Sequence, residues 1–300
     1  MIHKNILKTI GTTPLIKLNR VIRRKKLNIF AKLEGSNPSG SIKDRIALAM
    51  IEKAELKGQL SKAKIILEAS SGNTGISLAM IAAVKNYKVT IVMSNAASIE
   101  RRKIIQSFGA KVVLSNQEEG TAGAINKAHK LISRNSRKYF YTNQHNNLNN
   151  FLTHYQTTAP EIWRQTKGKI DYFICSIGTC GTVMGVAKFL KEKRPKIKVI
   201  AVEPQFGEKI EGIRNLDEKN SPRNFNLYKP DLIDEIVKVD RTEALNASRQ
   251  VIKEEGIFVG QSSGAAIAGI KKFAKTAKKG NIVTIFPDRG EKYLSTSLFD

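Results

Sequence analysis

Cysteine is scarce in this chain of 300 residues, which contains only Cys175 and Cys180. Two cysteines provide no disulfide framework, and no tract of Cys and His residues has the spacing of a structural zinc site. Long hydrophobic runs are also lacking: the longest, residues 76–84, is interrupted by Ser77 and is far shorter than the ~20 residues that cross a bilayer. The first residues contain no apolar signal segment. We therefore expect a reduced, cytoplasmic protein with no membrane partner and no bound metal.

Acidic side chains are outnumbered: 26 Asp and Glu face 51 Lys and Arg, which gives a formal net charge of +25. Such an excess makes a nucleic-acid-binding protein the first function class to consider. That class needs basic residues clustered on one face with aromatic side chains between them. Here the basic residues are spread along the chain, and aromatic residues form only 7% of it. We expect no nucleic-acid partner and keep this class as the alternative outside enzymes.

Short β-branched runs alternate along the chain with longer helical patterns. We predict strands at residues 64–68, 88–93, 110–114, 172–175, 198–202 and 282–286, and helices at residues 46–56, 75–86, 98–108, 121–133, 150–166, 181–193, 242–255 and 263–277. This alternation predicts parallel sheets with helices on both faces. The polar stretch 143–150 is the best candidate for a junction between two α/β domains. Ligands of such sheets bind outside the carboxyl ends of the strands, so the strand-to-helix loops are where chemistry is expected.

Lys43 stands in the first of these loops, residues 37–45, at the entrance of a predicted helix. The positive end of a helix and partial burial both lower the pKa of a lysine amine, and such an amine can form a Schiff base with a carbonyl compound. Most lysines in so basic a chain are surface groups. The loop by itself therefore leaves both interpretations open.

Three further loops open helices. Residues 70–75 read Ser-Ser-Gly-Asn-Thr-Gly, and their hydroxyls, amide and backbone N–H groups make an anion-binding nest that exceeds what an N-cap requires. Residues 178–182, Gly-Thr-Cys-Gly-Thr, can cradle a phosphate but match neither the P-loop nor the dinucleotide fingerprint. Cys180 is interpreted as a small filler, because no histidine lies near it in the sequence. The serines of residues 260–266 could be plain N-caps.

Taken together, these four loops resemble those of the cysteine synthase family, the O-acetylserine sulfhydrylases, which use pyridoxal phosphate and have a fold like that of the tryptophan synthase β subunit (fold type II). The resemblance extends from residue 10 to residue 296. It implies two three-layer α/β domains with mostly parallel sheets and a pyridoxal-phosphate cleft between them. Residues 38–147 would form a smaller, mobile substrate-binding domain, and residues 1–37 with 148–300 a larger cofactor-binding domain.

The resemblance also implies a role for each loop. Lys43 would hold the cofactor covalently and then act as the catalytic base. Asn73 would hydrogen-bond the cofactor's ring oxygen, and Ser262 would face its ring nitrogen. The phosphate would be bound by Gly178, Thr179, Cys180, Gly181 and Thr182, and the substrates by Ser70, Ser71, Thr74, Gln144 and Arg214.

The implied reaction is a β-replacement that makes L-cysteine from O-acetyl-L-serine, or O-phosphoserine, and sulfide or thiosulfate through an α-aminoacrylate intermediate. Residues 100–102, 154–163 and 212–214 resemble the B branch of the family, which accepts thiosulfate. Asn215 stands where a second arginine usually follows, which leaves the acceptor open. Cystathionine β-synthase, which uses homocysteine, is the main alternative; serine or threonine dehydratases are less similar. A homodimer is expected from the family alone.

Several other residues are given ordinary structural interpretations. Arg101 and Arg102 are expected at the surface of a helix, although one of them could face the cleft. His145 and His154 could lie near the cleft but are expected to have structural roles.

Overall fold

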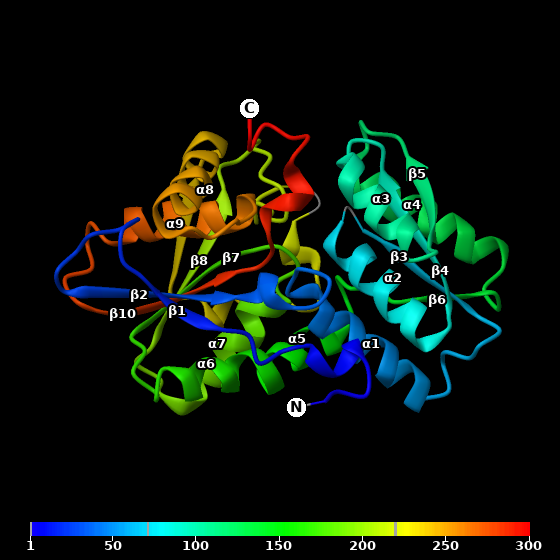
Figure 1. Cartoon of the computed structure of the whole chain (residues 1–300), viewed down its shortest axis with the longest axis horizontal. Helices are drawn as coiled ribbons and strands as arrows, with labels where there is room; N and C mark the ends of the chain where they lie inside the picture. The colour runs from blue at the N-terminus through cyan, green and yellow to red at the C-terminus, as the bar shows by residue number, and fades with distance from the viewer. Residues whose placement is uncertain (1, 71, 219–220) are drawn as a thin grey trace.

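A computed structural model of the chain describes residues 2–70, 72–218 and 221–300. Two α/β units lie side by side, each built on its own sheet (Figure 1). Ser71, one of the predicted substrate-binding residues, lies outside the described residues. Within these residues, no helix is both long enough and apolar enough to cross a membrane.

The larger unit contains a six-stranded sheet with helices on both faces (Figure 1). All neighbouring strands are parallel except the first pair, which is antiparallel. Alternate residues of the central strands pack on opposite faces: Phe173 and Cys175 belong to one hydrophobic cluster and Ile174 to the other. In spatial order the strands are β1 (Leu15–Leu18), β2 (Leu27–Leu33), β10 (Gly280–Phe286), β7 (Tyr172–Ser176), β8 (Lys198–Pro204) and β9 (Glu235–Val239).

Two groups of helices cover this sheet (Figure 1). The helices α8 (Arg241–Glu255) and α9 (Gln261–Phe273) lie on one face, and α5 (Leu148–Thr153), α6 (Ala159–Gln165) and α7 (Gly181–Lys193) on the other. This makes three layers, because both faces of the sheet are apolar and each must be buried.

The smaller unit is built on a parallel four-stranded sheet in the order β5 (Lys111–Ser115), β4 (Lys88–Ser94), β3 (Ile65–Ala69) and β6 (Tyr139–Tyr141). The helices α1 (Lys43–Leu56), α2 (Asn73–Lys85) and α3 (Ile99–Ser107) pack with one face of it, and α4 (Gly120–Arg134) covers the other. The predicted fold class, two three-layer α/β units with mostly parallel sheets, is confirmed.

The predicted elements were incomplete in two respects. Four strands were missed: β1, β2, β6 and β9. Of these, β1, β6 and β9 are edge strands; β1 and β6 have only four and three residues, and β9 has exposed charged residues. The helix predicted over residues 150–166 was wrong as a single element, because a π-helical turn, His154–Thr158, separates α5 from α6. The hydroxyls of Thr153 and Thr157 each donate to the carbonyl four residues earlier, which is a known cause of helix irregularity.

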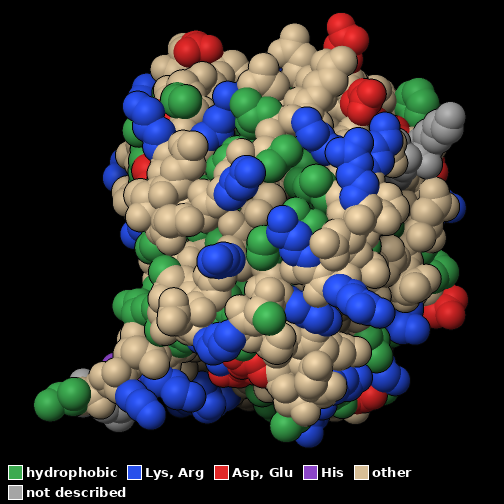
Figure 2. Space-filling model, turned by 90° about the vertical axis from the view of Figure 1, so that its right-hand side faces the viewer, with side chains coloured by type: hydrophobic (Ala, Val, Ile, Leu, Met, Phe, Trp, Pro, Cys, Tyr) green, Lys and Arg blue, Asp and Glu red, His purple; other side chains and the backbone are tan. Residues whose placement is uncertain are grey.

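On one face of the molecule, the Lys and Arg side chains are spread out and do not form a single patch (Figure 2). Figure 2 shows the face of the molecule on the side of the four-stranded sheet, where Lys and Arg side chains are scattered among other surface groups. This arrangement favours solvated lysines over a single basic stripe of the kind that nucleic acid requires.

A buried cluster of four charges joins β2, α1 and α6. The guanidinium of Arg45 contacts Glu34 (Nε to Oε2, 2.7 Å) and Glu161 (Nη1 to Oε1, 2.7 Å), and Glu161 also pairs with Lys32 (2.7 Å). The exposed fraction of these side chains is 10% or less. Two positive and two negative groups offset one another, which is the condition under which charges are tolerated in an interior. Arg45 lies two residues after Lys43, so the cluster holds the start of α1 against the larger sheet.

The buried cluster changes the pKa of the Glu161 carboxyl. Burial alone would raise its pKa, but the hydrogen bonds and charges of Arg45 and Lys32 outweigh burial and lower the pKa to about 2. A carboxyl whose pKa is lower in the folded than in the unfolded chain stabilises the fold above about pH 4.3, the usual pKa of glutamate, and loses that contribution as the pH falls toward 2.

We predict that Glu161→Gln lowers the free energy of unfolding at pH 7 by about 3 kcal/mol, because Arg45 and Lys32 lose their buried partner. The difference between variant and parent should shrink as the pH falls from 5 toward 3. Urea denaturation across this pH range measures both effects. The control is Glu192→Gln, which breaks the exposed pair of Glu192 with Lys188 and should change stability by less than about 0.5 kcal/mol. Equal losses in the two variants would contradict the prediction.

Candidate active site

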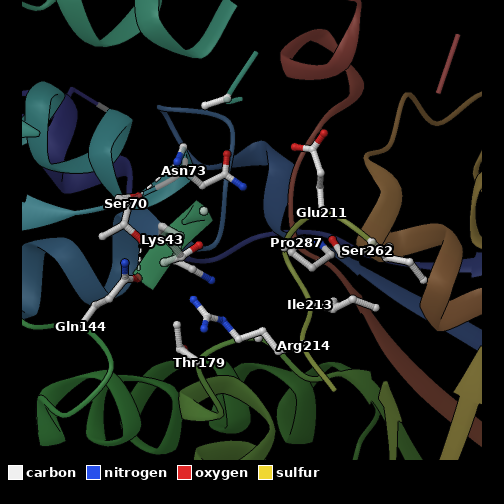
Figure 3. A pocket seen from close by; sticks show the side chains of 18 of the residues that line it. Lys43, Ser70, Asn73, Gln144, Thr179, Glu211, Ile213, Arg214, Ser262 and Pro287 are labelled. Carbon is white, nitrogen blue, oxygen red and sulfur yellow. Dashed lines mark hydrogen bonds between the residues drawn. The ribbon is translucent and has the colours of Figure 1, made fainter. Parts of the chain in front are cut away.

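A cavity of about 600 Å³ lies between the two units and is lined by the loops singled out in the sequence. Figure 3 shows Ser70, Asn73 and Gln144 on one side of it and Ser262 on the other. The loops after β7 and β10 reach this cavity together because these parallel strands end at the same edge of the larger sheet, and the loop after β3 reaches it from the smaller sheet.

Lys43 is the first residue of α1, and its side chain lines the cavity. The backbone just before it is tied to the end of β10, since the N–H of Ile42 donates to the carbonyl of Pro287 (2.8 Å). Burial lowers the pKa of the Lys43 amine, while the nearby charge of Asp288 opposes that shift. A lysine with a lowered pKa is more often neutral, and the neutral amine is the nucleophilic form.

The loop after β3 is organised around the hydroxyl of Ser70. This oxygen accepts from the N–H groups of Gly72 and Gly75, both at 3.2 Å, so its own proton is available toward the cavity that Ser70 lines. Thr74 donates to Oε1 of Gln144 (2.6 Å), which fixes the amide of Gln144 beside the loop. The structure therefore brings three of the predicted substrate-binding residues together at the N-terminus of α2.

The loop after β7 leaves no room for side chains at its glycines. A Cβ at Gly181 would lie 1.9 Å from Oδ1 of Asn150, and one at Gly178 would lie 2.6 Å from the carbonyl oxygen of Gly212. The hydroxyl of Thr179 accepts from Nδ2 of Asn150 (3.0 Å) and keeps its proton to donate. This narrow cradle at the N-terminus of the 13-residue helix α7 suits a phosphate group.

Thr182 and Cys180 are two further residues of this loop. Thr182 lies 3.2 Å from Nε2 of His154, whose Nδ1 lies 2.9 Å from Thr158. His154 thus has the structural position expected of it. Cys180 adopts a left-handed conformation (φ 69°), and burial raises the pKa of its thiol to about 12, so the thiol stays protonated.

The ring-binding residues of the implied cofactor also line the cavity. Ser262 lies in the first turn of α9 and is buried. Asn73 begins α2; its Nδ2 donates to Asp288 (2.6 Å), while its buried Oδ1 has no hydrogen-bond partner among the residues described. A cradle without side chains, a lysine with a lowered pKa and an amide whose NH₂ group gives one proton to Asp288 and keeps the other together fit pyridoxal phosphate.

Two residues whose place near the cleft the sequence left open line the cavity. Arg101 is buried there: it pairs with Glu211, and its guanidinium lies 4.5 Å from the centre of the Tyr293 ring. The buried imidazole of His145 also lines the cavity and packs against Phe225 (4.6 Å between ring centres). Burial first, and then the charges of Arg214 and Lys43, lower the pKa of His145 to about 3, so it is neutral at pH 7.

The stretch 143–150, predicted as a domain junction, supplies cavity residues: Gln144 and His145 line the site. A run of polar residues directly after a strand was the available signal. The sequence provides no indication of a role for Asp288, because no local pattern points to its contact with Asn73, which is 215 residues away.

Arg214 lines the cavity, whereas its neighbour Asn215 does not. The Asn215 side chain is buried and fully used: Nδ2 donates to the carbonyl of Pro204 (2.8 Å), and Oδ1 accepts from the N–H of Asp217 (2.7 Å). Asn215 thus stabilises the loop. In the described part of the chain, no group of three or more His, Cys, Asp or Glu residues could hold a metal ion.

Comparison with known proteins supports this interpretation of the site. The family model described as pyridoxal-phosphate dependent enzyme matches residues 6–288. Cysteine synthase B of Salmonella typhimurium is 43% identical over 291 residues, covering 97% of this chain and 94% of the relative.

Solved structures agree with the sequence relatives. Cysteine synthase from Entamoeba histolytica superposes with a TM-score of 0.89 at 41% identity, over 100% of this chain and 91% of that one. A hydrogen sulfide-producing enzyme from Fusobacterium nucleatum gives a TM-score of 0.91 at 40% identity, over 98% of this chain and 100% of that one. The chain therefore belongs to the pyridoxal-phosphate dependent enzymes and, within that family, to the cysteine synthase type.

Proposed function

We propose that this enzyme makes L-cysteine from O-acetyl-L-serine and sulfide by β-replacement. The observation that carries the proposal is the convergence of Lys43, Asn73, Ser262 and the 178–182 cradle on one cavity in a chain of the cysteine synthase type. When bound, pyridoxal phosphate supplies an electron sink that stabilises negative charge at the substrate's α-carbon.

Each residue at the cofactor then has a defined task. The backbone and hydroxyls of Gly178, Thr179, Cys180, Gly181 and Thr182 would bind the phosphate, and Asn73 the ring oxygen. Lys43 would hold the cofactor and later accept the α-proton at Nζ. Ser262 would offer a neutral hydroxyl to the ring nitrogen. A ring with such a neighbour withdraws electrons less strongly than a ring whose nitrogen is kept protonated by a carboxylate. The weaker electron sink favours prompt departure of the leaving group.

The substrate's carboxylate would bind at the N-terminus of α2. Ser70, Ser71, Thr74 and Gln144 are assigned to it, and Ser70 and Gln144 have protons left to donate toward the cavity. The positive end of α2 adds to the attraction. Binding at this end directs the β-carbon and its ester away from α2, toward the open part of the cavity.

The same proposal includes closure of residues 38–147 over the substrate. Support comes from the separation of the hydrophobic cores. The buried residues of the two clusters on the smaller sheet all lie within residues 47–128, except Leu7. The buried residues of the two clusters on the larger sheet all lie outside residues 38–147, except Ile42. Domains with separate cores move relative to each other at low cost. Closure would exclude water from the reacting groups.

Two further expectations rest on the family resemblance. We infer a homodimer, and we infer a cytoplasmic location. Size-exclusion chromatography with light scattering measures the first, and cell fractionation the second.

We predict that the purified enzyme loaded with pyridoxal phosphate forms cysteine fastest from O-acetylserine and sulfide. The measurement compares O-acetylserine, O-phosphoserine and serine as donors, each with sulfide, thiosulfate or homocysteine, and quantifies cysteine, cystathionine and pyruvate. Cystathionine as the main product would instead assign a cystathionine β-synthase. Pyruvate without an acceptor would assign a dehydratase.

Lys43→Ala should abolish both the yellow absorbance of the bound cofactor and cysteine formation, because the variant lacks the amine assigned to hold the cofactor and to accept the α-proton. Visible spectra after dialysis and a cysteine assay measure the two effects. Lys209→Ala is the matched control, since Lys209 also lines the cavity but is exposed. A yellow, active Lys43→Ala enzyme would refute the assignment.

Arg214→Met should raise the KM for thiosulfate about tenfold, the effect of losing a hydrogen bond to a charged group, and leave the KM for sulfide nearly unchanged. The larger dianion depends more on the guanidinium than the small sulfide ion does. Lys209→Met controls for the general effect of removing a positive charge from this cavity. Equal changes for the two acceptors would show that Arg214 does not select between them.

A further inference from the structure

Asp288 lies at the junction of the two units. It follows β10 of the larger sheet and is buried, and its backbone forms a bridge with Ser41, two residues before Lys43. Its side chain reaches across to Asn73 at the start of α2, which packs on the smaller sheet. Asp288 is therefore in contact with the segments that carry two of the assigned cofactor-binding residues.

The carboxylate of Asp288 determines how the amide of Asn73 is oriented. Oδ2 of Asp288 accepts from Nδ2 of Asn73 (2.6 Å) and from the hydroxyl of Tyr293 (2.6 Å). An ionised carboxylate only accepts hydrogen bonds, so the amide must turn its NH₂ group, and not its oxygen, toward Asp288. One proton of that NH₂ group remains available to an acceptor in the cavity.

The carboxylate has little freedom to move. A Cβ at Gly260 would lie 2.3 Å from Oδ1 of Asp288 and 2.5 Å from Cε2 of Tyr293, so only glycine leaves room for both groups. Arg101 covers the ring of Tyr293. Burial and the charge of Asp288 raise the pKa of the Tyr293 hydroxyl well above its usual value, so it remains a donor to Asp288.

We propose that Asp288, held by Tyr293, is a positioning residue that orients the amide of Asn73 toward the ring oxygen of pyridoxal phosphate. This inference rests on the proposed function, which assigns Asn73 to that oxygen. Asp288 acts through Asn73 and does not itself contact the cofactor. Its contribution to cofactor binding must then vanish when the Asn73 amide is removed.

A double-mutant cycle on cofactor affinity tests this requirement. The proteins are the wild type, Asp288→Ala, Asn73→Ala and the double variant, each stripped of cofactor and titrated with pyridoxal phosphate while the visible absorbance is followed. We expect Asp288→Ala to weaken binding about tenfold in the wild-type background, the size of a hydrogen bond to a charged group. In the Asn73→Ala background, the same substitution should weaken binding by less than about threefold.

Two conservative variants complete the test. Asp288→Asn retains an oxygen that can accept from both Asn73 and Tyr293, so it should bind the cofactor within about threefold of the wild type. Tyr293→Phe removes only one hydroxyl. If Asp288→Ala does not fold, Tyr293→Phe replaces it in the double-mutant cycle with Asn73→Ala. Thermal unfolding of the cofactor-free proteins identifies variants that have lost the fold.

The outcomes separate this inference from the proposed function. Equal losses in the two backgrounds, or no loss in the wild-type background, would overturn the role of Asp288. Failure of Asp288→Asn to recover affinity would also overturn it. A wild-type protein that binds no pyridoxal phosphate would overturn the proposed function instead.

Discussion

The attachment of the α1 entrance to the six-stranded sheet is the constraint on which the site depends. Arg45 is held from two sides, by Glu34 after β2 and by Glu161 of α6, and these contacts lie one half-turn from Lys43. Moving four charged groups out of water is costly, and only their mutual neutralisation makes it tolerable. A rotation of α1 would break these contacts, so the direction of the Lys43 side chain is set by an interaction that takes no part in the chemistry.

The cavity is completed by contacts between the two units, and these contacts are mainly polar. Asn73 bonds Asp288, Arg101 pairs with Glu211, and Ser98 donates to the carbonyl of Lys292 (2.8 Å). Polar contacts of this kind can be exchanged for water at small cost, unlike an apolar core. The buried charges thus hold the first turn of α1, with Lys43, against the larger sheet, while the polar contacts of Asn73, Arg101 and Ser98 leave the rest of the smaller unit able to move, which is what a site needs if it must admit substrate and then exclude water.

The candidate site could be predicted from the sequence where its residues belong to loops between a strand and a helix. The loops that carry Lys43, Asn73 and Ser262 are of this kind, because local composition and position in the α/β pattern identify them, whereas the roles of these three residues came from the resemblance to the cysteine synthase family. Arg101 and Asp288 were missed as site residues for the opposite reason. Their roles come from partners 110 and 215 residues away, and no local pattern carries that information.

The strands of the fold also differ in how clearly the sequence predicts them. Central strands such as β3, β4, β7 and β8 are buried on both faces and are therefore apolar runs that a sequence displays clearly. The edge strand β9 lacks this signal, because Glu235 and Lys238 are exposed.

The charge of +25 is not explained by the cavity. Among the residues that the structure describes, the cavity is lined by as many acidic as basic side chains, namely Glu118, Glu119, Glu211 and Glu218 against Lys43, Arg101, Lys209 and Arg214. Net charge is thus not concentrated at the site, and selection of anions there must come from the helix N-termini, the free hydroxyl protons and the placement of single guanidinium groups.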